Sequence, residues 1–180
     1  MSYRILEEAY GICGDGYFVG TPAVFLRFAD DDEAKADGCR SMPPSELIEA
    51  VKSHPSRHIV VSGRRLAEQF DTLLIDLLHD EGFFIQAETS GTQILPEGID
   101  WVTCVPEIGA ADDVCLRQID ELRVVYSGQD VDSTAGRIPA MHYFLQPESY
   151  SDGSSNVAET LEFVLSHPYW RLSIPLKNRY

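Results

Sequence analysis

Short apolar runs alternate with longer amphipathic stretches along this chain. Runs rich in Val, Ile, Leu and Phe predict β-strands, and apolar side chains at a spacing of three and four residues predict α-helices. The predicted strands cover residues 22–28, 58–61, 83–88, 100–105, 122–126, 142–145 and 170–174. The predicted helices cover residues 44–53, 66–80 and 156–166, with a short helix at residues 110–118.

The order of these elements indicates the fold class. A strand followed by a helix and a second strand is typical of a parallel sheet with right-handed crossovers. Residues 92–100 carry no helical pattern, so we expect the later crossovers to be loops. We therefore predict an α/β fold in which mostly parallel strands form a shortened, incomplete βα barrel. The 180 residues fit one domain, residues 1–180, with polar loops at residues 29–38 and 128–136.

The charge balance narrows the range of partners. The chain holds 14 basic and 29 acidic residues, a formal net charge of −15. Nucleic acids and anionic membranes attract clustered Lys and Arg, so we expect neither as a partner. The excess negative charge favours solubility through self-repulsion, with a basic partner surface as the alternative. No apolar run reaches 18 residues and no signal-peptide pattern is present, so we expect a cytoplasmic protein.

The histidines, cysteines and acidic residues do not have the spacing that metal sites require. His54 and His58 have the spacing of ligands on one helix, but Pro55 breaks a helix between them. The acidic run at residues 30–33 lacks the alternating ligands and the turn glycine of a calcium loop. No two of the four cysteines have zinc-knuckle or redox-pair spacing. The cysteines are Cys13, Cys39, Cys104 and Cys115. We therefore expect no metal site.

Five motifs, in order and spacing, resemble one enzyme family. Residues 10–28 hold a glycine-flanked turn at Asp15 and a Pro-Ala strand that ends at Arg27. A Glu-Thr-Ser-Gly-Thr motif begins at Glu88. The remaining motifs lie at residues 99–103, 145–147 and 167–173. Together these stretches resemble 7-carboxy-7-deazaguanine synthases, a family of radical S-adenosylmethionine enzymes.

The resemblance implies a fold, a reaction and a set of ligands. It implies a homodimer of shortened, radical-S-adenosylmethionine-like barrels. The family uses S-adenosylmethionine, a [4Fe–4S] cluster and Mg²⁺ to contract the ring of a carboxylated tetrahydropterin. By position, the substrate-side residues are Asp15, Arg27, Glu88, Thr89, Ser90 and Gln146. A guanidinium group suits a carboxylate or ring oxygens, and an Asp can accept two hydrogen bonds from an amino-pyrimidinone edge.

The sequence departs from the family where the cluster and the cofactors bind. The loop at residues 28–41 holds Cys39 alone, although a cluster with one open iron needs three thiolates from one loop. The family's Gly-Gly-Glu-Pro motif is replaced by Ser62, Gly63, Arg64 and Arg65. The two arginines put cations where a carboxylate met an ammonium group. We therefore expect no iron–sulfur cluster, and we expect S-adenosylmethionine and Mg²⁺ to be disfavoured.

Three hypotheses about function remain open. The first is a cluster-less relative that has lost radical chemistry and keeps a pocket for a pterin-like or deazapurine-like small molecule. The second is a diverged deazapurine-pathway enzyme with a non-radical reaction around Asp15, Arg27 and Cys13. The third is a scaffold protein in which the pocket is vestigial and a dimer or hetero-dimer surface carries the function, as in a non-catalytic partner of an active synthase. Plain structural roles stand beside these, since Arg27 can form an ion pair and Asp15 can cap a turn. Arg64 and Arg65 are also candidates for binding an anion at the former cofactor site.

Overall fold

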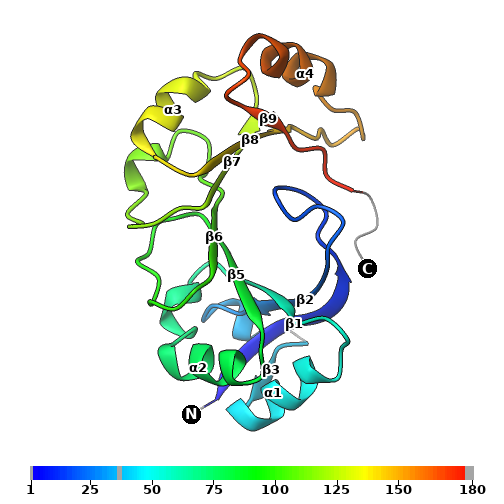
Figure 1. Cartoon of the computed structure of the whole chain (residues 1–180), viewed down its shortest axis with the longest axis vertical. Coiled ribbons are helices and arrows are strands. Elements are labelled where there is room, and N and C mark those ends of the chain that lie inside the picture. Colours follow the sequence, from blue (N-terminus) through cyan, green and yellow to red (C-terminus); the bar gives the residue numbers. More distant parts are fainter. Residues whose placement is uncertain (1, 36–37, 177–180) are drawn as a thin grey trace.

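The computed structural model describes residues 2–35 and 38–176 and contains one curved sheet. Its strands are β1 (Tyr3–Ile12), β2 (Pro22–Phe28), β3 (Arg40–Met42), β4 (His58–Ser62), β5 (Phe84–Thr89), β6 (Trp101–Cys104), β7 (Glu121–Tyr126), β8 (His142–Pro147) and β9 (Arg171–Leu172). Their order in the sheet is β3-β1-β2-β4-β5-β6-β7-β8-β9. The strand β1 is antiparallel to β2 and β3, and all other neighbours are parallel. The sheet stays open between β3 and β9, so the predicted incomplete barrel of mostly parallel strands is confirmed (Figure 1).

Helices cover the convex side of this sheet at its two ends (Figure 1). Within the described residues they are α1 (Pro44–Lys52), α2 (Thr72–Asp80), α3 (Val131–Arg137) and α4 (Val157–Ser166). The first two lie beside the β1–β5 half, and the last two lie beside the β7–β9 half. No helix in this part of the chain has the length and apolar character needed to cross a bilayer.

Two apolar clusters hold the helices on the sheet. In the first, Leu47 of α1 and Leu74 of α2 are fully buried against Ile59 and Ile85 of the central strands. The second cluster joins β7, β8 and α3, and includes the buried Trp170. The indole Nε1 of Trp170 donates a 2.8 Å hydrogen bond to Asp132 Oδ1 at the start of α3. The concave side of the sheet is left for the site.

The prediction of one continuous helix over residues 66–80 is wrong. The segment splits into a 3₁₀ turn (Leu66–Glu68) and the helix α2. Asp71 interrupts it, because its side chain accepts a hydrogen bond from the backbone N–H of Leu74 and so caps a new helix start. The Tyr3 hydroxyl donates to the same carboxylate at 2.9 Å, a contact from a distant strand that local periodicity does not record.

Two further predictions of local structure are wrong. Residues 110–118 form only a 3₁₀ turn (Ala111–Asp113), because Val114 is extended and the N–H of Cys115 bonds to Gly91 O at 2.9 Å. The polar loop expected at residues 128–136 contains α3, which begins at an Asp130 cap and buries Val131 and Ala135. The strands β1 and β3 were not predicted.

Candidate functional site

A cavity of about 590 Å³ opens at the carboxyl ends of the parallel strands. Ligands in open α/β sheets bind at this end, because loops there surround the strand termini. The cavity lies between the ends of β4, β5, β7 and β8 and the loop after β6. Its lining residues are Asp15, Ser62, Gly63, Arg64, Glu88, Thr89, Ser90, Thr92, Val105, Glu107, Ala110, Asp113, Arg123, Val125 and Gln146.

The cavity brings together most of the residues that the sequence singles out. On the predicted substrate side it gathers Asp15, Glu88, Thr89, Ser90 and Gln146, and on the altered cofactor side Ser62, Gly63 and Arg64. Arg27 and Arg65 are not among the lining residues. Arg27 forms an ion pair with Glu33, and Arg65 forms one with Glu68. Each of these two arginines is thus paired with a carboxylate that does not line the cavity.

The turn between β1 and β2 forms the floor of the cavity. It projects into the concave side of the sheet, where it is the blue loop in Figure 1. The N–H of Gly16 donates to Ser173 Oγ at 2.9 Å, and the N–H of Tyr17 donates to Glu121 Oε2 at 2.9 Å. The N–H of Leu176 donates to Gly14 O at 2.7 Å. The turn thus bridges the two halves of the open sheet and carries Asp15 into the site.

Aromatic side chains contact the same turn near the amino ends of the strands. The ring of Tyr17 lies 4.7 Å from the rings of both Trp101 and His142. The ring of Phe18 lies 4.8 Å from those of His58 and Trp101. All three partner residues lie at or near the amino ends of their strands, so the turn has an acidic face toward the cavity and an aromatic face away from it.

Arg123 is a buried, cavity-lining residue that the sequence motifs did not single out. Its side chain is 4% exposed, and its guanidinium contacts three carboxylates. It pairs with Asp15, lies 2.6 Å from Glu88 Oε1 through Nη2, and lies 3.7 Å from Glu121 Oε1 through Nε. A signal was present, because Glu121, Arg123 and Val125 alternate with Leu122 and Val124. Alternation of this kind places the charged residues on the concave face of β7.

Glu121 is the most deeply buried carboxyl of this cluster, at 1% exposure. Burial raises its pKa from 4.5 to about 7, against the opposing effects of the Tyr17 N–H and the Arg171 charge. Glu121 therefore changes its protonation state near neutral pH.

We expect Gly16→Ala to lower the free energy of unfolding by about 2 kcal/mol or more. A Cβ at this position would lie 2.2 Å from Glu121 Oε1, and φ is +69°, a conformation that non-glycine residues rarely adopt. Chemical denaturation of the variant and the wild type measures the loss.

Gly20→Ala is the matched control. Gly20 has a φ of +88° in the same turn, but no described heavy atom lies within 4 Å of its Cβ position. It should lose only the cost of the backbone conformation, about 1 kcal/mol. Equal losses in the two variants would show that the contact with Glu121 does not matter.

Ion pairs organise the segment where the family would place a cluster loop. The Asp30 carboxylate accepts the N–H groups of Asp32 and Glu33 at 3.0 and 2.8 Å. The Glu33 N–H holds the pKa of Asp30 below its ordinary value. Arg64 lies 3.6 Å from the same carboxylate, and Arg27 pairs with Glu33. The described part of this loop is thus fastened to β2 and to the segment after β4.

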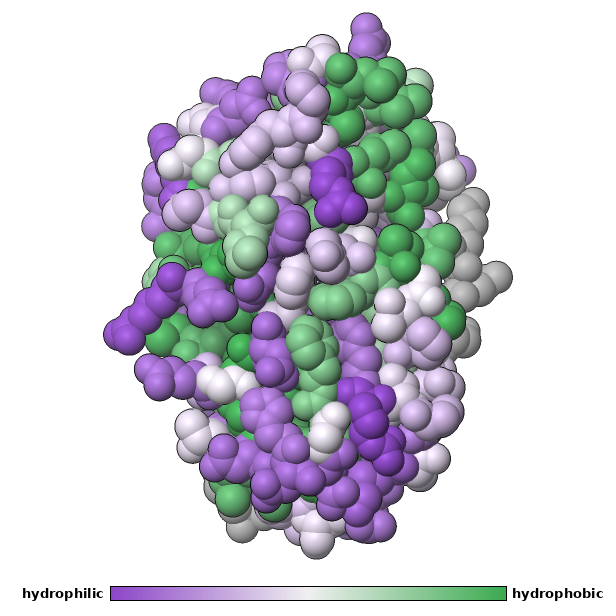
Figure 2. Space-filling view, viewed as in Figure 1, coloured by the Kyte–Doolittle hydropathy of each residue, from purple (hydrophilic) through white to green (hydrophobic). Residues whose placement is uncertain are grey.

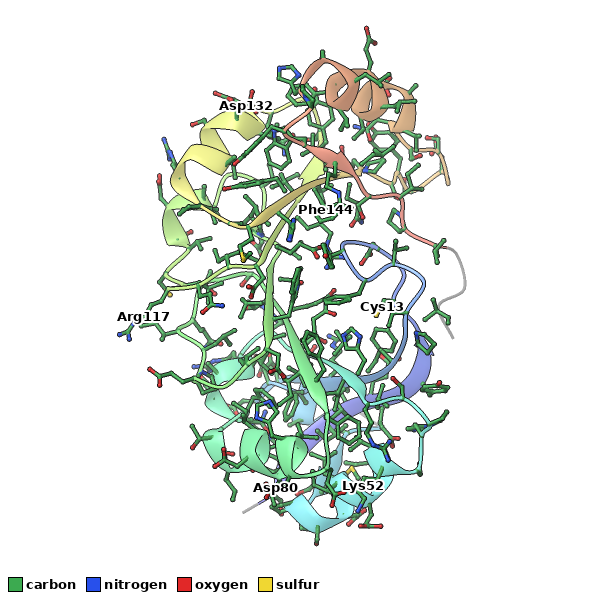
Figure 3. All side chains as sticks on the ribbon, viewed as in Figure 1. Cys13, Lys52, Asp80, Arg117, Asp132 and Phe144 are labelled. Atoms are coloured by element: carbon green, nitrogen blue, oxygen red, sulfur yellow. The ribbon has the colours of Figure 1, made fainter. Side chains whose placement is uncertain are left out.

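The thiols do not fit an iron–sulfur cluster. Cys39 is half-buried, Cys115 is exposed, and Cys13 is buried against Ala23 and Val60 near the blue loop (Figure 3). Cys104 belongs to a different apolar cluster, where burial raises the pKa of its thiol to about 12 and opposes the thiolate form that iron needs. Within residues 2–35 and 38–176, no three His, Cys, Asp or Glu side chains are arranged to hold a metal ion.

Comparisons with known proteins agree on one family. The chain is 39% identical over 180 residues to a 7-carboxy-7-deazaguanine synthase from Bacteroides thetaiotaomicron, which covers 97% of this chain and 95% of the relative. It is 30% identical over 203 residues to a protein of the same name from Bradyrhizobium diazoefficiens, covering 97% and 96%. The crystal structure of QueE from Escherichia coli matches with a TM-score of 0.74 at 22% identity, covering 98% of this chain and 95% of that one. No family model matches the chain.

Proposed function

Because the chain belongs to the 7-carboxy-7-deazaguanine synthase family, we propose that it binds a pterin-like or deazapurine-like heterocycle and has lost radical S-adenosylmethionine chemistry. One observation carries this proposal. Asp15, Glu88, Thr89, Ser90 and Gln146 line one cavity, and Arg64, at the cofactor position, lines its edge and lies 3.6 Å from Asp30 in the segment where the family would place the cluster loop.

The cavity supports the binding half of the proposal. A volume of about 590 Å³ lies in the range of about 300–1,000 Å³ that is usual for small-molecule pockets. Asp15 and Glu88 supply acceptors for an amino-pyrimidinone edge, and Thr89, Ser90 and Gln146 supply hydroxyl and amide groups beside them. These groups suit recognition of a polar bicycle more than an apolar ligand.

The donor set supports the loss of radical chemistry. A cluster with one open iron needs three thiolates, and the loop after β2 offers Cys39 alone. Arg64 lines the cavity and carries a positive charge where the resemblance puts the ammonium group of S-adenosylmethionine. We derive no reaction step through a cluster that these residues do not fit.

We also propose a cytoplasmic homodimer that has neither nucleic acid nor membrane as a partner. No disulfide bond joins the four described cysteines, as is usual in a reducing compartment. Apolar side chains gather over the region of α4 (Figure 2), where Leu165 is 77% and Leu161 is 42% exposed on one helix face. This surface supports pairing with a second copy of the chain.

We expect 7-carboxy-7-deazaguanine or the carboxylated tetrahydropterin to raise the thermal stability of the protein, and S-adenosylmethionine to leave it unchanged. A ligand at a hundred times its dissociation constant adds about 2.7 kcal/mol to the folded state. Differential scanning fluorimetry across a ligand titration measures this. Gln146→Leu, in the cavity, should reduce the shift, whereas the exposed Gln118→Leu should not.

Two results would contradict the proposal. Absence of any shift with both heterocycles would refute binding in this cavity. Anaerobic reconstitution with iron and sulfide that gave a brown protein able to cleave S-adenosylmethionine would refute the loss of radical chemistry.

A further inference from the structure

Arg123 lies at the cavity floor, beside the β1–β2 turn. It reaches two carboxylates that come from distant parts of the chain, Asp15 in the β1–β2 turn and Glu88 at the end of β5. All three residues line the cavity, and the side chain of Asp15 is only 6% exposed. Glu121 approaches the same guanidinium from below, where it packs against Gly16.

The charge of this guanidinium decides what the two carboxylates present to a ligand. Neighbouring carboxylates repel each other when both are ionised, and burial favours the protonated form further. A protonated carboxyl offers a donor in place of an acceptor. An opposite charge within about 4–6 Å reverses both effects and keeps the carboxylates ionised.

The two contacts also fix geometry. Nη1 pairs with Asp15 and Nη2 pairs with Glu88, so one planar group sets the separation and orientation of both acceptors. A planar guanidinium loses little freedom for each hydrogen bond that it forms. The Asp15 carboxylate is held from its other side by a turn that Glu121 and Ser173 anchor.

We propose that Arg123 is a positioning residue for ligand binding, which holds Asp15 and Glu88 ionised and oriented as a pair of acceptors. The ligand class that follows is a heterocycle whose inward edge is uncharged and carries at least two N–H donors, with any carboxylate placed away from this pair of acceptors. This inference rests on the proposed function, because it concerns the same cavity. The alternative role for Arg123 is competition with the ligand. A guanidinium has the same planar N–H pattern as the ligand edge, so in this role it would occupy the acceptors of Asp15 and Glu88 in place of the ligand.

The test is the pH profile of ligand binding. The dissociation constant of 7-carboxy-7-deazaguanine is measured by titration calorimetry between about pH 5 and about pH 8. Glu121→Gln is introduced in every variant, so that this buried carboxyl does not titrate within the range; Arg123 and Arg123→Lys should then give flat profiles, with weaker binding by the lysine variant. Arg123→Met should bind about tenfold more weakly or worse, and its affinity should fall further as the pH is lowered.

A ligand-free measurement keeps the inference separate from the proposed function. Carbon-13 NMR of the side-chain carboxyls should show Asp15 and Glu88 ionised across this range in the wild type. In Arg123→Met one of them should take up a proton within it. If Arg123→Met does not fold, Arg123→Lys and the double variant Arg123→Met, Asp15→Asn are compared in its place, and the double variant should still bind more weakly than the lysine variant.

The outcomes divide clearly. Tighter or unchanged binding with a flat profile, in Arg123→Met or in the double variant that replaces it, would overturn the inference and favour internal competition. If the wild type binds no heterocycle, the proposed function fails and the carboxyl titration alone decides on Arg123. A wild-type carboxyl of this pair that takes up a proton within the range would then overturn the inference as well.

Discussion

Arg123→Met is expected to lower the free energy of unfolding by about 3–5 kcal/mol, the usual cost of removing one partner from a buried ion pair. The variant keeps most of the side-chain volume but leaves Asp15, Glu88 and Glu121 around a site without its cation. Desolvated carboxylates with no positive partner must either protonate or admit water, and both outcomes cost stability. Denaturant unfolding at neutral pH measures the loss.

Arg117→Met is the matched control for this prediction. Arg117 is exposed and points away from the body of the molecule (Figure 3). Its replacement should change stability by less than about 0.5 kcal/mol. A loss below about 1 kcal/mol in Arg123→Met would show that the ion pairs of Arg123 are solvated and do not stabilise the cavity floor.

A double-mutant cycle isolates the contact with Asp15. Asp15→Asn alone removes one carboxylate from the guanidinium, and the double variant with Arg123→Met removes both charges together. Since the two residues touch, the double variant should lose clearly less stability than the sum of the two single variants. Additive losses would mean that the floor does not depend on this pairing.

The sequence predicts the sheet better than it predicts the floor of the site. The parallel strands are short apolar runs, and the order of strands and helices limits the topology to few choices. The sequence pattern does not predict strand β1, because Glu7 and Glu8 interrupt its apolar run. Both residues nevertheless pair with β2 in the sheet. The pattern does not predict the short helix α3 either, because few of its seven residues are apolar.

Long-range contacts explain what the sequence could not predict about the site. Gly16 and Ser173 are separated by 157 residues, and Tyr17 and Glu121 by 104, so no local pattern reports that the turn spans the barrel. The resemblance singled out Asp15, Glu88 and Gln146, and the structure places all three in the lining of one cavity. It also suggested Arg27, whose position at the end of β2 is suitable, but Glu33 in the following turn pairs with it.

Glu121→Gln is expected to remove a pH dependence of stability that the wild type carries. The folded-state pKa of about 7 lies above the ordinary 4.5, so the folded protein holds this proton more tightly than the unfolded chain. That contribution is fully present below pH 4.5 and is lost as the pH rises to 7 and beyond. At about 1.4 kcal/mol for each pKa unit, the wild type should lose about 3 kcal/mol over this interval from this group.

A neutral amide does not titrate, so the difference between Glu121→Gln and the wild type should grow with pH. The two should be similar near pH 4.5, where the carboxyl is protonated, and the variant should be more stable by up to about 3 kcal/mol at about pH 8. The amide oxygen of Gln can still accept the N–H of Tyr17, so the turn stays anchored. Glu97→Gln, at an exposed position, should show no such trend. If the stability advantage of Glu121→Gln over the wild type shrinks as the pH rises, Arg123 stabilises the ionised form of Glu121 and the pKa of Glu121 is not raised.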